Sequence, residues 1–327
     1  MIVEIADPSQ TAAARRAAVQ LALDNGFDDT GAGRIALVAT EMATNLLKHA
    51  GGGMIVIQRI VDGDGDDLEL LSLDKGPGIG NVPRALEDGY STGGSPGTGL
   101  GAIRRQADRF ALYAPPGLGT AVLARFARAQ PPRERDGVTL GAVVEAHPGE
   151  TEAGDDWAFG AAAEGPSLLM VDGSGHGPLA AKAAHTAVST FCAHLPRDAA
   201  ALAETIHHAL RPTRGAAIAL ARIDAREKLV RFVGIGNIAG ATLDEGGMRR
   251  MVSHNGIAGH VAGRIREFTY PYAGAATVIL HSDGLSAKWD LAAYPGLATS
   301  HPGLIAGVLF RDLRRGRDDA SIVVMRT

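Results

Sequence analysis

Hydrophobic positions in the first part of the chain recur with two different periods. Over about residues 33–50 they return every three to four positions, which predicts a helix with one apolar stripe. The runs 54–61 and 68–73 are short, apolar and joined by an acidic, glycine-rich turn, which predicts a β-hairpin. A helix followed by a hairpin indicates a mixed α and β fold for this region.

The predicted helix at 33–50 carries a second stripe, which is polar. Glu41, Asn45, Lys48 and His49 stand at i, i+4, i+7 and i+8, so they share one face of a regular helix. Taken alone, such a stripe most often faces solvent. Its functional groups make a candidate site only if neighbouring segments supply matching chemistry.

Acidic residues stand at the ends of apolar runs in the second part of the chain. Two such runs end in Asp172 and Asp283, and Asp318 shortly precedes the last run, at 321–325. If these strands are neighbours in one sheet, their carboxylates meet at one edge. Clustered carboxylates are the ligands that hard divalent cations prefer, so the pattern predicts a metal site.

The composition limits the classes of function. With 327 residues, 46% of them hydrophobic, the chain is long enough for about two packed domains. A net charge of −4 gives no basic footprint, so neither nucleic acid nor a membrane surface is an expected partner. The single cysteine excludes an intrachain disulfide and, with no signal-like or membrane-spanning segment in view, fits a cytoplasmic location.

One segment has the composition of a linker. Residues 128–137 contain a proline pair among alternating charges and show no hydrophobic period. We therefore predict one domain at 1–127 and a second at 138–327. No internal repeat relates the two, so they are expected to be different folds rather than a duplication.

Glycine-rich motifs follow the predicted hairpin. Asp74, Gly76 and Gly78 form a D-x-G-x-G sequence at the end of its second strand, and Gly97-x-Gly99-x-Gly101 leads into a predicted helix at 102–110. Glycines before a helix leave backbone N–H groups free to hold phosphate. The second motif is neither a Walker loop nor a dinucleotide fingerprint.

In this order, Glu41-x-x-x-Asn45 and the two glycine motifs resemble the N, G1 and G2 boxes of the GHKL ATPases, over about residues 1–127. The resemblance implies that ATP and Mg²⁺ bind here. Asn45 would ligate Mg²⁺, Glu41 would orient or deprotonate the attacking hydroxyl, and Asp74 would accept from the adenine amino group. Lys48 would contact phosphate, and the other nucleotide contacts would come from Gly76, Gly78, Gly97, Thr98, Gly99, Leu100, Gly101 and Thr120.

The local sequence over residues 41–50 looks most like the switch kinases and anti-sigma factors of bacterial partner-switching systems. That likeness implies an ATP-dependent serine or threonine kinase. The alternative is a module that binds ATP without catalysis, and either sequesters a sigma factor or its antagonist or acts as a sensor. Retention of both Glu41 and Asn45 favours the kinase, because a pure binder needs no base.

The second domain resembles the SpoIIE-type metal-dependent serine/threonine phosphatases over about residues 138–327. The motifs that carry the likeness are, in chain order, Gly-Asp155, Asp172-Gly173-Ser-Gly-His-Gly, Gly-Asn237, Asn255-Gly-Ile-Ala-Gly259, Ser-Asp283-Gly and Asp318-Asp-Ala-Ser. It implies that Asp155, Asp172, the Gly173 carbonyl, Asp283 and Asp318 hold two Mn²⁺ or Mg²⁺ ions bridged by a hydroxide. Asp156 and Asp319 are neighbours that could replace Asp155 and Asp318 as ligands.

His176 stands where lysine is commoner in this family. This residue and the Gly-Asn237 segment look closest to those of the stressosome feedback phosphatase. This histidine would either protonate the leaving group or only hydrogen-bond within its loop. The expected architecture is α+β, with a GHKL (Bergerat) α/β sandwich followed by a phosphatase α-β sandwich. By the same resemblances, the opposing activities would act on a STAS-domain antagonist or stressosome scaffold in control of a sigma factor.

Overall fold

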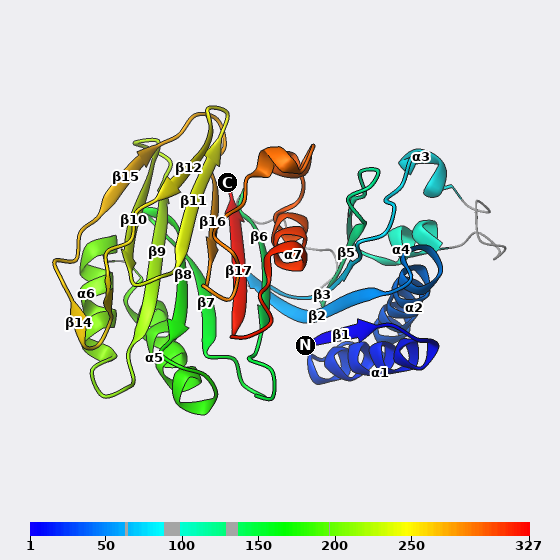
Figure 1. Cartoon of the computed structure of the whole chain (residues 1–327), viewed down its shortest axis with the longest axis horizontal. Coiled ribbons are helices and arrows are strands. Elements are labelled where there is room, and N and C mark those ends of the chain that lie inside the picture. The colour runs from blue at the N-terminus through cyan, green and yellow to red at the C-terminus, as the bar shows by residue number, and fades with distance from the viewer. Residues whose placement is uncertain (63–64, 88–98, 129–136, 196) are drawn as a thin grey trace. The chain divides into compact units, whose positions relative to one another are not determined.

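The computed structural model describes residues 1–62, 65–87, 99–128, 137–195 and 197–327. The chain, shown in Figure 1, divides into two compact units. Unit 1 comprises Met1–Glu134 and Ala292–Arg311, and unit 2 comprises Arg135–Leu291 and Asp312–Thr327. Unit 1 thus includes a stretch from late in the sequence, which the predicted division did not anticipate. The predicted linker lies almost wholly outside the described residues, so it stays a prediction.

Unit 1 is built on a five-stranded antiparallel sheet of order β1-β2-β3-β5-β4. The predicted hairpin is confirmed as β2 and β3, in which Met54 lies opposite Leu73. The strands are β1 (Ile2–Ile5), β2 (Gly53–Asp62), β3 (Gly65–Leu73), β4 (Arg109–Tyr113) and β5 (Ala121–Ala127). The helices of the N-terminal part are α1 (Pro8–Asp24), α2 (Asp29–Asn45), α3 (Val82–Ala85) and α4 (Gly99–Gln106).

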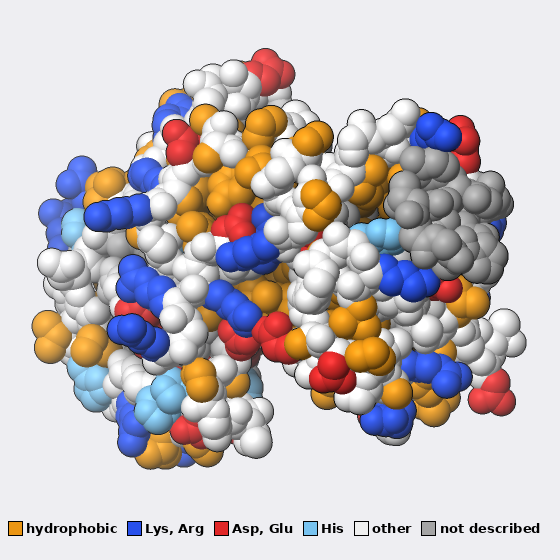
Figure 2. Space-filling model, turned by 45° about the vertical axis from the view of Figure 1, so that its right-hand side comes forward, with side chains coloured by type: hydrophobic (Ala, Val, Ile, Leu, Met, Phe, Trp, Pro, Cys, Tyr) orange, Lys and Arg blue, Asp and Glu red, His pale blue; other side chains and the backbone are white. Residues whose placement is uncertain are grey.

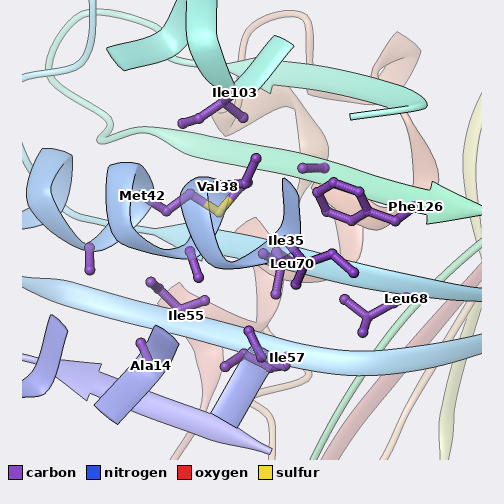
Figure 3. Packing of buried hydrophobic residues seen from close by; sticks show 14 of the residues in the cluster. Ala14, Ile35, Val38, Met42, Ile55, Ile57, Leu68, Leu70, Ile103 and Phe126 are labelled. Carbon is purple, nitrogen blue, oxygen red and sulfur yellow. The ribbon is translucent and has the colours of Figure 1, made fainter. Parts of the chain in front are cut away.

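The core of unit 1 lies between this sheet and its helices. Ile35, Val38 and Met42 of α2 are buried and pack in one cluster with Leu70 of β3 and Phe126 of β5 (Figure 3). These α2 residues belong to the apolar stripe predicted from the sequence. Each such side chain contributes about 1.5–3 kcal/mol relative to its exposed state. Their burial fixes the rotation of α2 about its axis and, with it, the position of the polar stripe.

The other face of the sheet in unit 1 contacts α7 (Pro302–Leu313). All residues of α7 from Pro302 to Arg311 are buried. A Cβ on Gly303 would lie 2.4 Å from Leu123 Cδ1, and one on Gly307 would lie 2.7 Å from Leu71 Cδ2. The two glycines therefore let the backbone of α7 approach the sheet more closely than any side chain would allow.

Two predicted helices end earlier than expected. α2 stops at Asn45 and continues as a π-helical turn, Leu46–Ala50. The wider turn rotates Lys48 and His49 away from their α-helical positions, so the predicted four-residue stripe is not regular. The predicted helix at 102–110 ends at Gln106, because Arg109 and Phe110 pair in β4 with β5.

Unit 2 contains two five-stranded sheets, of order β15-β10-β9-β8-β7 and β12-β11-β16-β17-β6. The first is formed by β7 (Asp155–Ala162), β8 (Gly165–Gly173), β9 (Ala216–Asp224), β10 (Leu229–Ile235) and β15 (Phe268–Pro271). The second is formed by β6 (Thr139–Glu145), β11 (Ala239–Asp244), β12 (Gly247–Met251), β16 (Thr277–His281) and β17 (Ala320–Arg326). β13 (Gly256–Ile257) and β14 (Val261–Ala262) form a separate hairpin.

Two helices, α5 (Pro178–His194) and α6 (Ala199–Ala209), pack on the first of these sheets. Their alanine-rich faces share a core with alternate residues of β8, β9 and β10. Short 3-10 turns at Leu291–Ala293 and Leu297–Thr299 precede α7. The predicted α+β class, with two different α-β folds in one chain, is therefore confirmed.

The carboxylates of unit 2 come from both sheets, so the condition that their strands are neighbours in one sheet is not met. Asp155 and Asp172 lie opposite each other, where β7 begins and β8 ends. Asp283 follows β16 and Asp318 precedes β17, and these two strands pair in the second sheet. In each sheet, antiparallel pairing places the end of one strand beside the start of its neighbour. A run of apolar residues does not reveal which sheet it will join.

Charged side chains of both signs are interspersed on the face drawn in Figure 2. The net charge of the whole chain is −4. Among the helices of the described ranges, none has the length and apolar character that crossing a membrane requires.

Candidate functional sites

Asp74 follows the last residue of β3 and is held there by backbone donors. Its Oδ1 accepts hydrogen bonds from the N–H of Gly76 at 2.7 Å and the N–H of Thr120 at 3.0 Å. Its own N–H donates to the Thr120 carbonyl at 2.9 Å, which joins the turn after β3 to the turn before β5. Burial raises the pKa of Asp74, and these N–H donors oppose that shift. The result is a fixed carboxylate that can accept from a ligand.

The glycines after Asp74 are required by close contacts. A Cβ on Gly76 would lie 2.8 Å from Ala50 Cβ. Gly78 has a φ of +72°, and a Cβ there would lie 2.2 Å from the Pro115 carbonyl oxygen. Larger residues at either position would displace the turn that carries the carboxylate.

The structure brings the N box of the ATPase region next to the start of α4. A Cβ on Gly99 would lie 3.1 Å from Asn45 Oδ1, so the Asn45 side chain faces the first residue of that helix. Glu41 lies one turn earlier on α2 and is half-buried. Lys48 is exposed in the π-helical turn.

The second glycine motif is only partly described. Gly97 and Thr98 lie outside the described residues. Leu100 and Gly101 lie in the first turn of α4, where backbone N–H groups have no partner within the helix.

Asp155, which is buried, and Asp172, which is half-buried, form one side of an acidic cluster in unit 2. Asp155 is 4% exposed; its Oδ2 accepts from Ser321 Oγ at 2.6 Å, and its Oδ1 is buried without a hydrogen-bond partner. Burial, together with the neighbouring carboxylates of Asp319 and Asp283, raises the pKa of Asp155 to about 7. Burial and the surrounding carboxylates raise the pKa of Asp172 to about 8.

Asp283 and Asp318 complete the group from the second sheet. Asn237 Nδ2 donates to Asp283 Oδ2 at 2.6 Å, which fixes the orientation of that carboxylate. Asp318 Oδ1 accepts from the Asp319 N–H at 2.9 Å. Both carboxylates contribute to the raised pKa of Asp172, so all lie within electrostatic reach of one another.

The neighbours that could replace two of these residues have different surroundings. Asp156 faces α5, where its Oδ2 lies 3.9 Å from His185 Nε2. Asp319 is 4% exposed; its Oδ1 accepts from the His147 N–H at 2.8 Å, and its Oδ2 is buried without a hydrogen-bond partner. Asp156 therefore lies apart from the cluster, whereas Asp319 lies in it.

Gly173 is the last residue of β8, and His176 lies in the turn between β8 and α5. The Gly173 N–H donates to the Gly154 carbonyl at 3.0 Å, and a Cβ on Gly173 would lie 2.3 Å from the Ala180 carbonyl oxygen. His176 Nδ1 lies 2.8 Å from Glu150 Oε1. Its ring stacks on that of His147 with centroids 4.2 Å apart. These contacts fix the ring plane of His176.

A cavity of about 540 Å³ lies beside the acidic cluster. Its lining includes Asp172, His176, Asn237, Asp283 and Asp318. The described residues contain no group of three or more His, Cys, Asp or Glu side chains already arranged around one point as a metal shell. Two buried carboxylate oxygens without partners, on Asp155 and Asp319, nevertheless fit a cation, because oxygens of this kind need a positive partner.

Three residues of this site were not selected from the sequence. Asn237 was noted only within a motif, although it holds Asp283. Glu150 lies in a loop without periodicity, and only the structure places it against His176. Asp319 was given second place to Asp318, yet it has the buried oxygen. Adjacent acids point in different directions, and spacing alone does not resolve which one faces a site.

Comparison with known families explains this arrangement. A family model described as stage II sporulation protein E (SpoIIE) matches residues 164–327, which is half of the chain. The chain belongs to the SpoIIE family. In this SpoIIE-family chain, residues 5–126 match a second model, described as a histidine kinase-like ATPase domain. The predicted fusion of a GHKL-type domain with a SpoIIE-type domain is therefore confirmed.

The ATPase domain also resembles a characterised kinase. It is 36% identical over 112 residues to the serine/threonine-protein kinase RsbT of Bacillus subtilis (strain 168). The match covers 34% of this chain and 84% of RsbT. The similarity therefore extends through most of that kinase.

Two solved structures resemble the SpoIIE-family chain. One is described as the bacterial stressosome, a modular system adapted to control secondary messenger signalling; it has a TM-score of 0.53 and 27% identity, over 59% of this chain and 100% of that chain. The other is the PP2C phosphatase domain with a fragment of the regulatory domain of SpoIIE from Bacillus subtilis. It has a TM-score of 0.50 and 17% identity, over 97% of this chain and 95% of that chain. A domain with the PP2C fold is thus joined to a kinase-related ATPase domain.

Proposed function

We propose that this SpoIIE-family protein is a bifunctional regulator of a bacterial partner-switching pathway. Its ATPase domain phosphorylates a serine or threonine of a STAS-domain protein, and its phosphatase domain removes that phosphate. The stressosome structure and the RsbT kinase among its relatives support this kind of partner. A sigma factor is then the downstream target, and the cytoplasm is the compartment in which these proteins meet.

The acidic cluster of unit 2 is the observation that carries the proposal. Asp155 and Asp172 have pKa values raised to about 7 and about 8, because burial disfavours the charged form of each group and the neighbouring carboxylates repel its charge. A cluster of buried carboxylates is stable in its charged form when bound cations neutralise the negative charge. Asp155, Asp172, Asp283, Asp318 and the Gly173 carbonyl are the groups proposed to hold two Mn²⁺ or Mg²⁺ ions, with Asp319 beside them.

The bound ions would supply a hydroxide nucleophile and neutralise the charge of the phosphoryl group. Asn237 and Ser321 orient two of the ligands, since they donate to Asp283 and Asp155. His176 lines the cavity with its ring fixed by Glu150. It can give a proton to the serine or threonine oxygen as that oxygen leaves.

In the ATPase domain, the proposed roles follow the arrangement around Asp74 and α4. Asp74 accepts from the adenine amino group, and the first turn of α4 donates backbone N–H groups to phosphate. Asn45 holds Mg²⁺ beside that turn, and Lys48 contacts phosphate. Glu41 orients or deprotonates the attacking hydroxyl, a role that fits phosphoryl transfer by positioning and charge neutralisation.

A second candidate keeps the phosphatase and removes the kinase. In that case the ATPase domain binds ATP and senses it, or sequesters a partner, without transferring phosphate. The packing of α7 favours a sensor: it lies within the segment matched to SpoIIE, yet it packs on the sheet of unit 1.

Phosphate transfer separates the two candidates. We would follow label from γ-labelled ATP into a STAS-domain protein from the same organism, in an Asp172→Asn background so that the phosphatase does not remove the product. Glu41→Gln is expected to lower transfer by about 10²-fold or more while ATP binding is unchanged, because it removes the base. The matched control Glu164→Gln changes an exposed carboxylate in unit 2 and should transfer normally. If the Asp172→Asn protein with Glu41 unchanged binds ATP but transfers no phosphate, that result would contradict the kinase and support the sensor.

A further inference from the structure

α7 carries a buried arginine that contacts the backbone beside the proposed nucleotide site. Arg311 is 5% exposed. Its Nη1 donates to the carbonyl oxygen of Asp74, and its Nη2 donates to that of Leu118 at 2.9 Å. The first carbonyl lies just after β3 and the second lies in the turn before β5. One guanidinium group therefore ties together the two segments that hold the Asp74 carboxylate.

The surrounding backbone is shaped to admit this side chain. A Cβ on Gly119 would lie 2.6 Å from Arg311 Nη1 and 2.0 Å from the Asp74 carbonyl oxygen. Gly119 also has a φ of +77°, a conformation that glycine adopts without strain. The planar fork of arginine can serve two acceptors at once, which the single ammonium group of lysine does less well.

The position of Arg311 is set by the packing of α7 in unit 1. Gly303 and Gly307 lie against Leu123 and Leu71, on the face of the sheet opposite to the one that α2 covers. Arg311 lies on the last turns of the same helix, so this packing brings its guanidinium to the end of β3. The contact links residues 237 positions apart in the sequence, so the local sequence around either residue does not predict it.

We propose that Arg311 is a positioning residue of the nucleotide site, supplied from the C-terminal part of the chain. By holding the carbonyls of Asp74 and Leu118, it fixes the direction of the Asp74 carboxylate toward the adenine amino group. Its positive charge also favours the charged form of that carboxylate, which is the better acceptor. The inference rests on the proposed nucleotide site, and it extends that site to residues 292–311.

Nucleotide discrimination tests this role. We would measure the dissociation constants of ADP and GDP with Mg²⁺ for the full chain, by calorimetry, in the wild type, Arg311→Met and Arg311→Lys. Arg311→Met is expected to lower the preference for ADP over GDP at least about fivefold, because two buried carbonyls lose their donor and the carboxylate loses its aim. Arg311→Lys should recover part of the preference. Arg16→Met, an exposed arginine of α1, is the matched control and should keep it.

A merely structural role gives a different result. It would weaken ADP and GDP equally, together with a lower melting temperature, and an unchanged preference in Arg311→Met would overturn the proposal. If Arg311→Met does not fold, the ratio of the ADP and GDP dissociation constants in Arg311→Lys decides between a positioning role and a merely structural one. A folded wild type that binds neither nucleotide would overturn the proposed nucleotide site and this inference together. A preference for ADP that the wild type and Arg16→Met show and that Arg311→Met loses supports both.

Discussion

Single residues in unit 2 show how strongly its fold depends on charge. Asp155 is buried and Asp172 is half-buried, and the two lie opposite each other across β7 and β8. Their pKa values are raised to about 7 and about 8, first by burial and then by the carboxylates around them. Ordinary aspartates in an unfolded chain titrate near pH 4. Folding without metal therefore takes up protons at neutral pH.

The stability of the metal-free protein should depend on pH accordingly. Because the folded-state pKa values are raised, the folded protein keeps protons that the unfolded chain has lost, and stability falls as pH rises from about 4 to about 8. With a chelator present, the melting temperature of unit 2 should be lower at pH 8.5 than at pH 6. Addition of Mn²⁺ should reduce this difference. Asp172→Asn should flatten the dependence, with Glu164→Gln as the control. If the melting temperature changes equally with pH in Asp172→Asn and Glu164→Gln, the acidic cluster is not the cause of the pH dependence.

The site residues differ in how far the sequence predicts them. Asp74, Gly76, Gly78 and Asn45 stand in ordered motifs with known spacing, and the structure places Asn45 beside the start of α4. Glu150 and Arg311 carry no such spacing. Their roles come from contacts between segments distant in the sequence, which local patterns do not encode.

At the scale of elements, the pairing of β3 with β5 buries an ion pair on the face next to α7. Glu69 and Arg125 are directly opposite each other in the register, with 2.6 Å between Arg125 Nε and Glu69 Oε2. Their side chains are 0% and 2% exposed. A Cβ on Gly303 of α7 would lie 3.3 Å from Glu69 Oε2, so the helix passes close over the pair.

Breaking this pair should destabilise unit 1. Arg125→Met leaves Glu69 charged and buried, and we expect a loss of about 3–5 kcal/mol in the free energy of unfolding of that unit. Replacing both residues, as Glu69→Leu with Arg125→Met, should recover most of it, because no uncompensated charge remains. Denaturant unfolding followed by circular dichroism measures both. If the double variant is as unstable as the single one, packing rather than charge explains the loss.

The elements were predicted better than their ends. Apolar periodicity correctly predicted the β2–β3 hairpin and the stripe of α2. It did not predict the π-helical turn after Asn45, which is followed by Gly51 and Gly52 at positive φ. It also missed the switch from helix to strand near Arg109, where pairing with β5 outweighs local helical preference.

At the scale of the molecule, the sequence predicts two folds but not how the chain is shared between the compact units. The composition of residues 128–137 predicts a linker, whereas nothing in residues 292–311 distinguishes them from other apolar helix and turn segments. They group with unit 1 through contacts such as Gly307 with Leu71. Immediately after them, Arg315 donates its N–H to the Gly284 carbonyl in unit 2, next to Asp283. The segment after α7 thus reaches the loop of a proposed metal ligand.

The most direct test of the account is phosphate release from a phosphorylated STAS-domain protein. The wild type and Glu164→Gln should release phosphate only when Mn²⁺ or Mg²⁺ is added, and Asp172→Asn should release it at least about 10²-fold more slowly, because one proposed ligand of the ions is lost. Melting curves with and without Mn²⁺ would establish that each protein is folded and binds metal. Release that needs no metal, or that Asp172→Asn leaves unchanged, would contradict the account, as would no release by a folded, metal-loaded wild type.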